Sequence, residues 1–169
     1  MSRVQRGGFN RTLHPDIESQ FPDAYIGMGI TAENLANSHQ ISRRNQELFA
    51  ASSHEKAINA QERGYFRDEI VSVEGVSLDG CMRSPNLEKM AKLNPAFIEN
   101  GTVTAATSSP LTDGAAALLL CSEEFATAHG LKPLASIIST AVSGVPPEIM
   151  GYGPVPSSVK ALQRAGLNM

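Results

Sequence analysis

Two cysteines are the side chains in this sequence best suited to nucleophilic chemistry. Cys81 lies in a loop two residues before Arg83, and Cys121 ends an apolar run immediately before an expected helix. A neighbouring guanidinium or a helix N-terminus lowers the pKa of a thiol, and the thiolate is the reactive form. The alternatives are an ordinary loop thiol at Cys81 and a buried core thiol at Cys121. No histidine stands near either cysteine in the sequence, although the fold could bring one close.

The histidines do not group at the spacing of a metal site. His14 precedes Pro15 with no second ligand nearby, which favours a surface histidine because metal ligands come in clusters. His54 falls inside an expected helix, where a partly buried or solvated histidine is favoured over a catalytic one. The sequence therefore predicts no bound metal ion.

Residues 101–121 contain a distinctive run of small polar residues. Gly101-Thr-Val-Thr is followed by hydroxyl residues at 107–109, then by Pro110, by Asp-Gly and by an unbroken apolar run at 115–120. A short apolar run after a turn is a buried strand or a buried helix, and its length favours a strand. The hydroxyl groups can satisfy the backbone of their own loop and let a ligand approach the main chain.

This stretch resembles the thiolases, the acyl-CoA C-acyltransferases, which share Gly-Thr-Val-Thr-Ala and, after a short spacer, Asp-Gly-Ala-Ala-Ala. Other blocks in the family's order are Gly27-Met-Gly-Ile-Thr-Ala-Glu-Asn34, Leu93-Asn-Pro-Ala-Phe97, Met150-Gly-Tyr-Gly-Pro-Val-Pro156 and Ala161-Leu-Gln-Arg-Ala-Gly166. The Ser-Ser-Pro-Leu-Thr-Asp-Gly form is most similar to the branch that serves fatty-acid β-oxidation. A thiolase is more than twice as long as these 169 residues, so the chain resembles an internal fragment.

The resemblance implies an acetyl-CoA C-acyltransferase, which transfers acyl groups to coenzyme A by thiolytic cleavage of 3-ketoacyl-CoA. It implies coenzyme A as a substrate, acyl-CoA as the binding partner, no permanently bound cofactor, and assembly as a homo-oligomer or with a partner subunit. The segments that carry the cysteine nucleophile and the histidine base of thiolases are not found here, so we expect no catalytic residue and no activity from this chain alone. The alternative is a non-catalytic coenzyme A-binding or subunit-docking module.

The resemblance also implies substrate-binding positions. Met28 would line the acyl pocket, Thr107 and Ser109 would lie beside the pantetheine arm of coenzyme A, and Met150 with Gly151 would form a second wall. Thr107 stands where thiolases usually have Asn. The alternative is structural, with the methionine filling a core and the glycine making a tight turn.

Composition narrows the class of protein. The net charge is −3 and no cluster of Lys and Arg resembles a phosphate-backbone groove, so we expect no nucleic acid partner. No apolar run approaches the roughly 18 residues that a membrane-spanning helix needs. The first residues lack the apolar stretch of a secretory signal. Two cysteines do not make a disulfide framework, which favours a reducing compartment and hence the cytoplasm.

The elements that must position these residues alternate between helices and strands. Helices are expected after caps at Thr31, Ser42, Asn86, Ser122 and Ser157 or Ser158, with stops at Leu93, Gly64, Gly130 and Gly166. Strands are expected at residues 69–77, 115–120 and 134–142. This alternation predicts an α/β fold.

The resemblance refines this prediction to part of a thiolase fold, a mixed sheet with helices plus a loop domain that covers the core. We expect an irregular connecting segment at residues 1–24, the coenzyme A-covering loop domain at 25–100, and part of the α/β core at 101–169.

Overall fold

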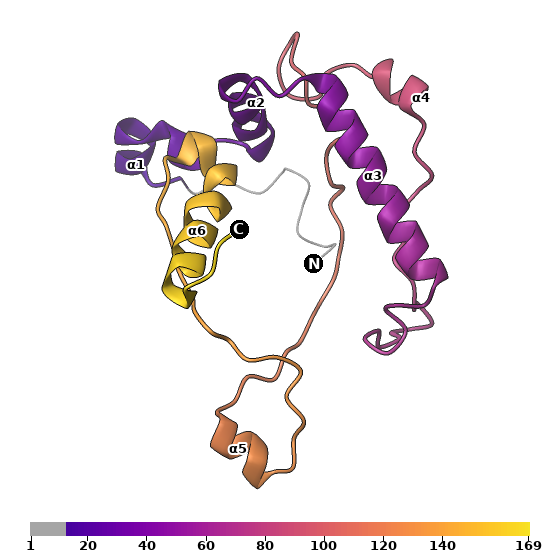
Figure 1. The fold of residues 1–169 in the computed structure, drawn as a ribbon. Helices are drawn as coiled ribbons and strands as arrows, with labels where there is room; N and C mark the ends of the chain where they lie inside the picture. The colour runs from indigo at the N-terminus through magenta and orange to yellow at the C-terminus, as the bar shows by residue number, and fades with distance from the viewer. Residues whose placement is uncertain (1–12) are drawn as a thin grey trace. The chain divides into compact units, whose positions relative to one another are not determined.

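The computed structural model describes residues 13–169 (Figure 1). These residues divide into two compact units. The larger unit consists of Leu13–Pro110 and Pro147–Gly151. The described part of the smaller unit consists of Leu111–Pro146 and Tyr152–Met169. Every regular element in the described residues is helical, so the expected mixed sheet is not present among them.

The larger unit begins with helix where the sequence predicts an irregular segment. The α-helix α1 covers Pro15–Gln20, and the 3-10 helix η1 covers Pro22–Tyr25. Each begins with proline, whose fixed φ suits the first helical position and whose missing N–H has no cost there. Residues 1–12 lie outside the described part of the chain. The division into domains at residues 24 and 100 remains a prediction.

The helix α2 covers Met28–Ser38 and begins before the cap predicted at Thr31. Gly27 takes the cap position, and Thr31 lies inside the helix, where its hydroxyl donates to the Met28 carbonyl at 2.7 Å. A threonine hydroxyl can accept from a free N–H at a helix start or donate to a carbonyl one turn back. Here it does the second, so the predicted cap is wrong.

The long helix α3 covers Arg43–Glu62 and has the predicted boundaries. The Ser42 hydroxyl accepts a hydrogen bond from the Asn45 N–H at 3.2 Å, which satisfies one of the free donors of the first turn. Gly64 follows the end of the helix with a φ of +71°, a left-handed conformation that glycine adopts without strain.

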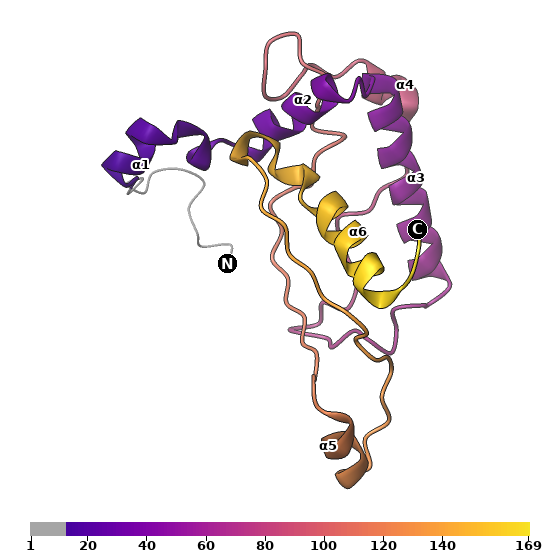
Figure 2. The ribbon, with the colours of Figure 1, turned by 60° about the vertical axis from the view of Figure 1, so that its left-hand side comes forward.

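The short helix α4 covers Leu87–Ala91 and lies alongside α3 (Figures 1 and 2). The predicted cap is confirmed, because the Asn86 side chain accepts from the Lys89 N–H at 2.9 Å. The helix ends before Leu93, where the sequence predicts its end. Arg43 of α3 donates to the carbonyls of Met90, Ala91 and Leu93 at 2.9, 3.3 and 2.6 Å, which satisfies acceptors at this helix end.

The strand predicted at residues 69–77 is wrong, because the chain reverses inside it. Val73 and Val76 form an isolated antiparallel bridge, with N–H to carbonyl distances of 3.1 and 2.9 Å. Between them Glu74 and Gly75 both have positive φ, 50° and 83°. Two such residues make the tight hairpin turn that suits paired strands, so the alternating pattern belongs to a minimal hairpin rather than one strand.

The core of the larger unit is small and partly polar. Its buried apolar side chains come from α2, α3, α4 and the segment that begins at residue 101: Ala36, Ala51, Met90 and Val103. Four polar side chains are buried beside them: Thr31, Glu33, Glu47 and Thr104. Glu47 is 2% exposed and accepts from Arg43 Nε at 2.8 Å, so its charge is paired inside the unit.

The smaller unit contains the helices α5, Glu123–Ala128, and α6, Pro154–Ala165. The cap of α5 is confirmed, because the Ser122 hydroxyl accepts from the Phe125 N–H at 3.2 Å. The cap of α6 is wrong, since the helix begins after Gly153 with a proline at its start and contains Ser157. The stops at Gly130 and Gly166 are confirmed by φ values of +62° and +70°. The 3-10 helix η2, Pro147–Tyr152, precedes α6 in the sequence and belongs to the larger unit except for Tyr152.

The strands predicted at residues 115–120 and 134–142 are also wrong for the described residues. Both segments lack ladder hydrogen bonds and expose their apolar side chains, with Leu118 at 89% and Leu134 at 98%. The second segment is held by single bonds to α6, including Ser139 Oγ donating to the Ala161 carbonyl at 2.7 Å. A strand is defined by its pairing, and neither segment finds a partner in the described chain.

Candidate functional site

The larger unit has a cavity of about 840 Å³ beside α3, which is open to solvent. One face of α3 forms a wall, the loop at residues 80–83 forms a second, and two segments near residues 96 and 107 complete it. The lining residues are Phe49, Ala50, Ser53, His54, Ala57, Gly80, Cys81, Met82, Arg83, Ala96, Phe97, and residues 105–110. Most of these side chains are small or apolar, with hydroxyl groups and one guanidinium added, a composition typical of ligand pockets.

The predicted residues Thr107 and Ser109 both line this cavity. Thr104, which is fully buried, organises the loop that carries them. Its N–H donates to the Thr107 hydroxyl at 3.0 Å, and its carbonyl accepts from the hydroxyls of Thr107 and Ser108 at 3.2 and 2.9 Å. These two hydroxyls therefore shape the loop.

Ser109 differs from its neighbours in the loop. Its side chain is exposed, and its hydroxyl makes no hydrogen bond within residues 13–169. A hydroxyl at the cavity wall with both its donor and its acceptor capacity unused by the described residues can bond a ligand amide. Among the predicted binding residues, Ser109 is therefore the one whose polar group is open to a ligand.

His54 is a cavity residue to which the sequence gives no binding role. Its Nδ1 accepts a hydrogen bond from the Arg83 N–H at 3.3 Å, which ties the loop at residues 80–83 to α3. This contact requires an unprotonated Nδ1, so a neutral His54 carries its proton on Nε2. The fold thus brings His54 and Cys81 to one cavity, although they stand far apart in the sequence.

The second cysteine belongs to the smaller unit. Cys121 is exposed in the smaller unit, so the expectation of a buried core thiol is wrong. The segment before it does not pack as a strand, and the thiol therefore has no core to enter. Cys81 is an exposed loop thiol, as expected.

Glu33 of α2 fixes the backbone of residues 102 and 103 through hydrogen bonds. It is only 6% exposed, and its carboxylate accepts from the N–H groups of Thr102 and Val103 at 2.9 and 2.8 Å and from the Thr102 hydroxyl at 3.0 Å. Burial opposes ionisation of this carboxyl, but the three donors outweigh it and hold the pKa of Glu33 below its ordinary value. Gly101 leaves room for the carboxylate, since a Cβ there would clash with it.

The same network reaches α3. The Thr102 hydroxyl accepts from Gln46 Nε2 at 2.9 Å while it donates to Glu33. The Val103 carbonyl accepts from the Ala96 N–H at 2.9 Å, which fixes the segment that carries Phe97. Two walls of the cavity are therefore positioned by hydrogen bonds that meet at Glu33 and its neighbours. The only signal of this hydrogen-bond network in the sequence is indirect, namely the presence of Glu33 inside the block at residues 27–34.

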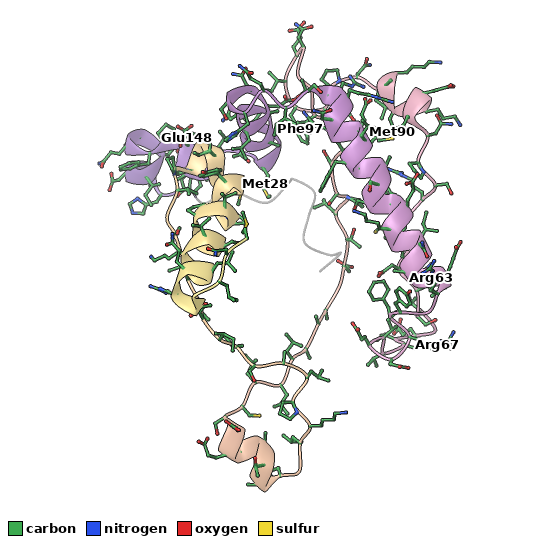
Figure 3. All side chains as sticks on the ribbon, in the orientation of Figure 1. Met28, Arg63, Arg67, Met90, Phe97 and Glu148 are labelled. Atoms are coloured by element: carbon green, nitrogen blue, oxygen red, sulfur yellow. The ribbon has the colours of Figure 1, made fainter. Side chains whose placement is uncertain are left out.

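Three predicted residues lie outside the cavity lining. Met28, in the first turn of α2, is 70% exposed (Figure 3), and Met150 is 45% exposed. Gly151 packs against Leu35, whose Cδ1 would lie 3.0 Å from a Cβ placed there. The Asn34 side chain donates to the Glu148 carbonyl at 3.0 Å, so η2 is attached to α2. The binding roles of these three residues remain predictions.

Metal binding and membrane insertion are two further possibilities for residues 13–169. No group of three His, Cys, Asp or Glu side chains there could hold a metal ion. None of the described helices is both long enough and apolar enough to cross a bilayer.

Comparison with known proteins gives a consistent result along the chain. The family model described as the N-terminal domain of thiolase matches residues 9–124. The 3-ketoacyl-CoA thiolase of Serratia proteamaculans is 48% identical over 168 residues, and that of Chromohalobacter salexigens 46% over 166. The alignments cover 93% and 92% of this chain but only 43% and 42% of the relatives. The chain thus spans less than half the length of the curated relatives it matches.

Solved structures agree with the sequence matches. Human mitochondrial 3-ketoacyl-CoA thiolase in complex with CoA superimposes with a TM-score of 0.83 at 36% identity, covering 98% of this chain and 45% of that one. The dimeric peroxisomal thiolase of Saccharomyces cerevisiae gives a TM-score of 0.86 at 36% identity, covering 99% and 44%. The path of this chain therefore follows part of a thiolase.

Proposed function

The chain belongs to the thiolase family, and we propose that its larger unit builds the coenzyme A-binding cavity of a 3-ketoacyl-CoA thiolase. The observation that carries the proposal is the cavity of about 840 Å³, which brings Thr107 and Ser109 together with α3 and the loop at residues 80–83. Nearly all of this chain is similar to part of human mitochondrial 3-ketoacyl-CoA thiolase, which has been solved in complex with CoA.

The chemistry of the cavity suits the pantetheine arm of coenzyme A. That arm is neutral and carries two amides, which need a few hydrogen-bonding groups between apolar walls. Ser109 offers an open hydroxyl, and the alanines and Phe97 supply apolar surface. The phosphates of the ligand need cations, for which Arg83 at the cavity and Lys89 and Lys92 near it in the sequence are the candidates.

The reaction we propose for the whole enzyme is thiolytic cleavage of 3-ketoacyl-CoA, in which coenzyme A accepts the acyl group. A cysteine thiolate is the nucleophile of such acyl transfer, because it attacks readily and also leaves readily from a thioester. Neither Cys81 nor Cys121 has that role in this proposal. The residues of this chain bind and orient the coenzyme A moiety, and catalytic groups outside residues 1–169 perform the exchange. We place the enzyme in the cytoplasm as a homo-oligomer or with a partner subunit.

The second candidate is a subunit-docking module without catalysis. It is favoured by the apolar side chains that the smaller unit exposes, such as Leu118 at 89% and Leu134 at 98%. The two candidate functions differ in whether the cavity must bind coenzyme A, because docking by the smaller unit does not require it.

Calorimetric titration of the 169-residue chain with coenzyme A and with dephospho-coenzyme A tests the proposal. A site lacking the catalytic segments should bind in the high micromolar range, about −5 to −6 kcal/mol. Ser109→Ala should weaken binding by about 1 kcal/mol, the net contribution of a neutral hydrogen bond. Ser38→Ala, which alters a hydroxyl of α2 that bonds the Leu35 carbonyl, is the matched control and should bind as the parent does. Undetectable binding at millimolar ligand would refute a coenzyme A site in this chain and leave the docking module.

A further inference from the structure

We propose that Gly29 is a positioning residue that seats the Phe97 ring against α2 and thereby sets the width of the cavity. The inference rests on the proposed function, because it takes coenzyme A as the occupant of that cavity. Gly29 is the second residue of α2. Phe97, which is labelled in Figure 3, lines the cavity. The two residues stand in separate segments of the larger unit.

The backbone of Gly29 gives no reason for a glycine. Its φ is not in the left-handed region, and it lies within a regular helix. A glycine in that setting is unfavourable by roughly 0.8–1 kcal/mol relative to alanine. The requirement must therefore come from packing, that is, from a group that occupies the space where a side chain would be.

That group is the aromatic ring of Phe97. A Cβ built on Gly29 would lie well inside contact distance of three ring carbons, Cγ, Cδ1 and Cε1. To restore an ordinary carbon–carbon separation of about 3.5 Å, the ring would have to move by more than about 1 Å. Gly27, two residues earlier, has nothing within 4 Å of an equivalent Cβ, so the close approach is specific to position 29.

The Phe97 backbone is poorly placed to make this adjustment. The preceding residue is fixed through the hydrogen bond from the Ala96 N–H to the Val103 carbonyl, and Val103 is held in turn by Glu33. The Phe97 ring both contacts α2 at Gly29 and lines the cavity, so a side chain at position 29 that displaces the ring also displaces a wall of the cavity. The bare helix surface at Gly29 thus keeps the space beside Phe97 open.

Four variants of the 169-residue chain test the assignment: Gly29→Ala, Gly27→Ala, Phe97→Ala, and Gly29→Ala combined with Phe97→Ala. Coenzyme A affinity is measured by chemical-shift titration, which reaches millimolar dissociation constants, and helix content by circular dichroism. Gly29→Ala should bind at least about tenfold more weakly, the cost of a methylene-sized misfit in a pocket. Gly27→Ala, the matched control, adds a methyl group in open space and should keep the parent affinity.

The double variant distinguishes a specific clash between position 29 and the Phe97 ring from a general loss of structure. Alanine at position 97 removes every ring carbon that a Cβ at position 29 would meet, so in the Phe97→Ala background adding Gly29→Ala should cause no further loss of affinity. If Gly29→Ala alone fails to fold, a double variant that folds and binds like Phe97→Ala still supports the inference. A Gly29→Ala chain with parent affinity, or a loss that persists in the Phe97→Ala background, would overturn it. Parent protein that binds no coenzyme A would overturn the proposed function and this inference with it.

Discussion

Replacing Glu33 by Gln should destabilise the larger unit strongly, because no amide can serve all the donors that the carboxylate serves. The Thr102 N–H lies 2.9 Å from both carboxylate oxygens, the Val103 N–H lies 2.8 Å from one, and the Thr102 hydroxyl lies 3.0 Å from the other. Gln has a single acceptor oxygen. If the amide oxygen of Gln takes the position of Oε1, it can still accept from both N–H groups. The amide NH₂ then takes the position of Oε2 and faces the Thr102 hydroxyl.

The hydroxyl already accepts from Gln46 at 2.9 Å, and accepting from the new NH₂ would use its second lone pair while its own proton loses the carboxylate partner. The expected cost is therefore one lost hydrogen bond and the loss of charge assistance in two others, about 2–3 kcal/mol in total. That is a large part of the 5–15 kcal/mol by which domains are usually stable.

The loss of stability caused by Glu33→Gln should decrease as the pH falls. The pKa of Glu33 is lower in the folded protein than its ordinary value of 4.5, so the folded state favours the ionised form. The stabilisation is fully present above about pH 4.5 and is lost as pH falls through the folded pKa, because protons then compete with the three donors. The stabilities of the parent and of Glu33→Gln should therefore converge below pH 4.5.

Urea unfolding followed by far-ultraviolet circular dichroism measures this, since α2 and α3 both belong to the larger unit. The matched control is Glu55→Gln, which changes an exposed glutamate of α3 and should shift the midpoint little. Equal midpoints for the two variants at pH 7 would refute the reasoning. So would a difference between the parent and Glu33→Gln that stayed constant from pH 7 to pH 3.

Two further outcomes concern the chain as a whole. Purified alone, it should not cleave acetoacetyl-CoA or longer 3-ketoacyl-CoA by thiolysis. Acetyl-CoA release that Cys81→Ser or Cys121→Ser abolishes would show that one of these thiols is the nucleophile. The chain should also bind a hydrophobic dye or self-associate, because residues 118–120 and 134–142 expose apolar side chains. Dye fluorescence and light scattering measure this, and a sharply melting monomer without dye signal would contradict it.

Local chemistry accounts for the helix boundaries that sequence reasoning found and for those it missed. Ser42, Asn86 and Ser122 are caps, since each side chain accepts from an N–H three residues ahead. Thr31 and Ser157 have the same hydroxyl chemistry but donate backwards, to the carbonyls of Met28 and Gly153 at 2.7 and 2.8 Å. The residue type cannot distinguish these two roles, because a hydroxyl is both a donor and an acceptor.

The cavity could be predicted only in part. Thr107 and Ser109 were available from the resemblance to thiolases, and both line it. The groups that position the walls depend on contacts over long sequence separations, such as Glu33 with Val103, 70 residues apart. His54 is placed by a bond to Arg83, 29 residues later. No periodicity or spacing encodes such pairs, so they emerge only from the folded chain.

The apolar segments of the smaller unit show why strand patterns are less self-sufficient than helix patterns. A helix closes its hydrogen bonds within its own residues, so a capped segment such as α5 forms even though only one of its residues, Ala126, is buried. A strand must bond a neighbour, and residues 115–120 and 134–142 have none in the described chain. The pattern that predicts strands there describes side chains suited to a buried sheet, and apolar runs without alternation suit a sheet covered on both faces. The chain follows less than half of its thiolase relatives, and we infer that the rest of a thiolase supplies the pairing that turns these segments into strands.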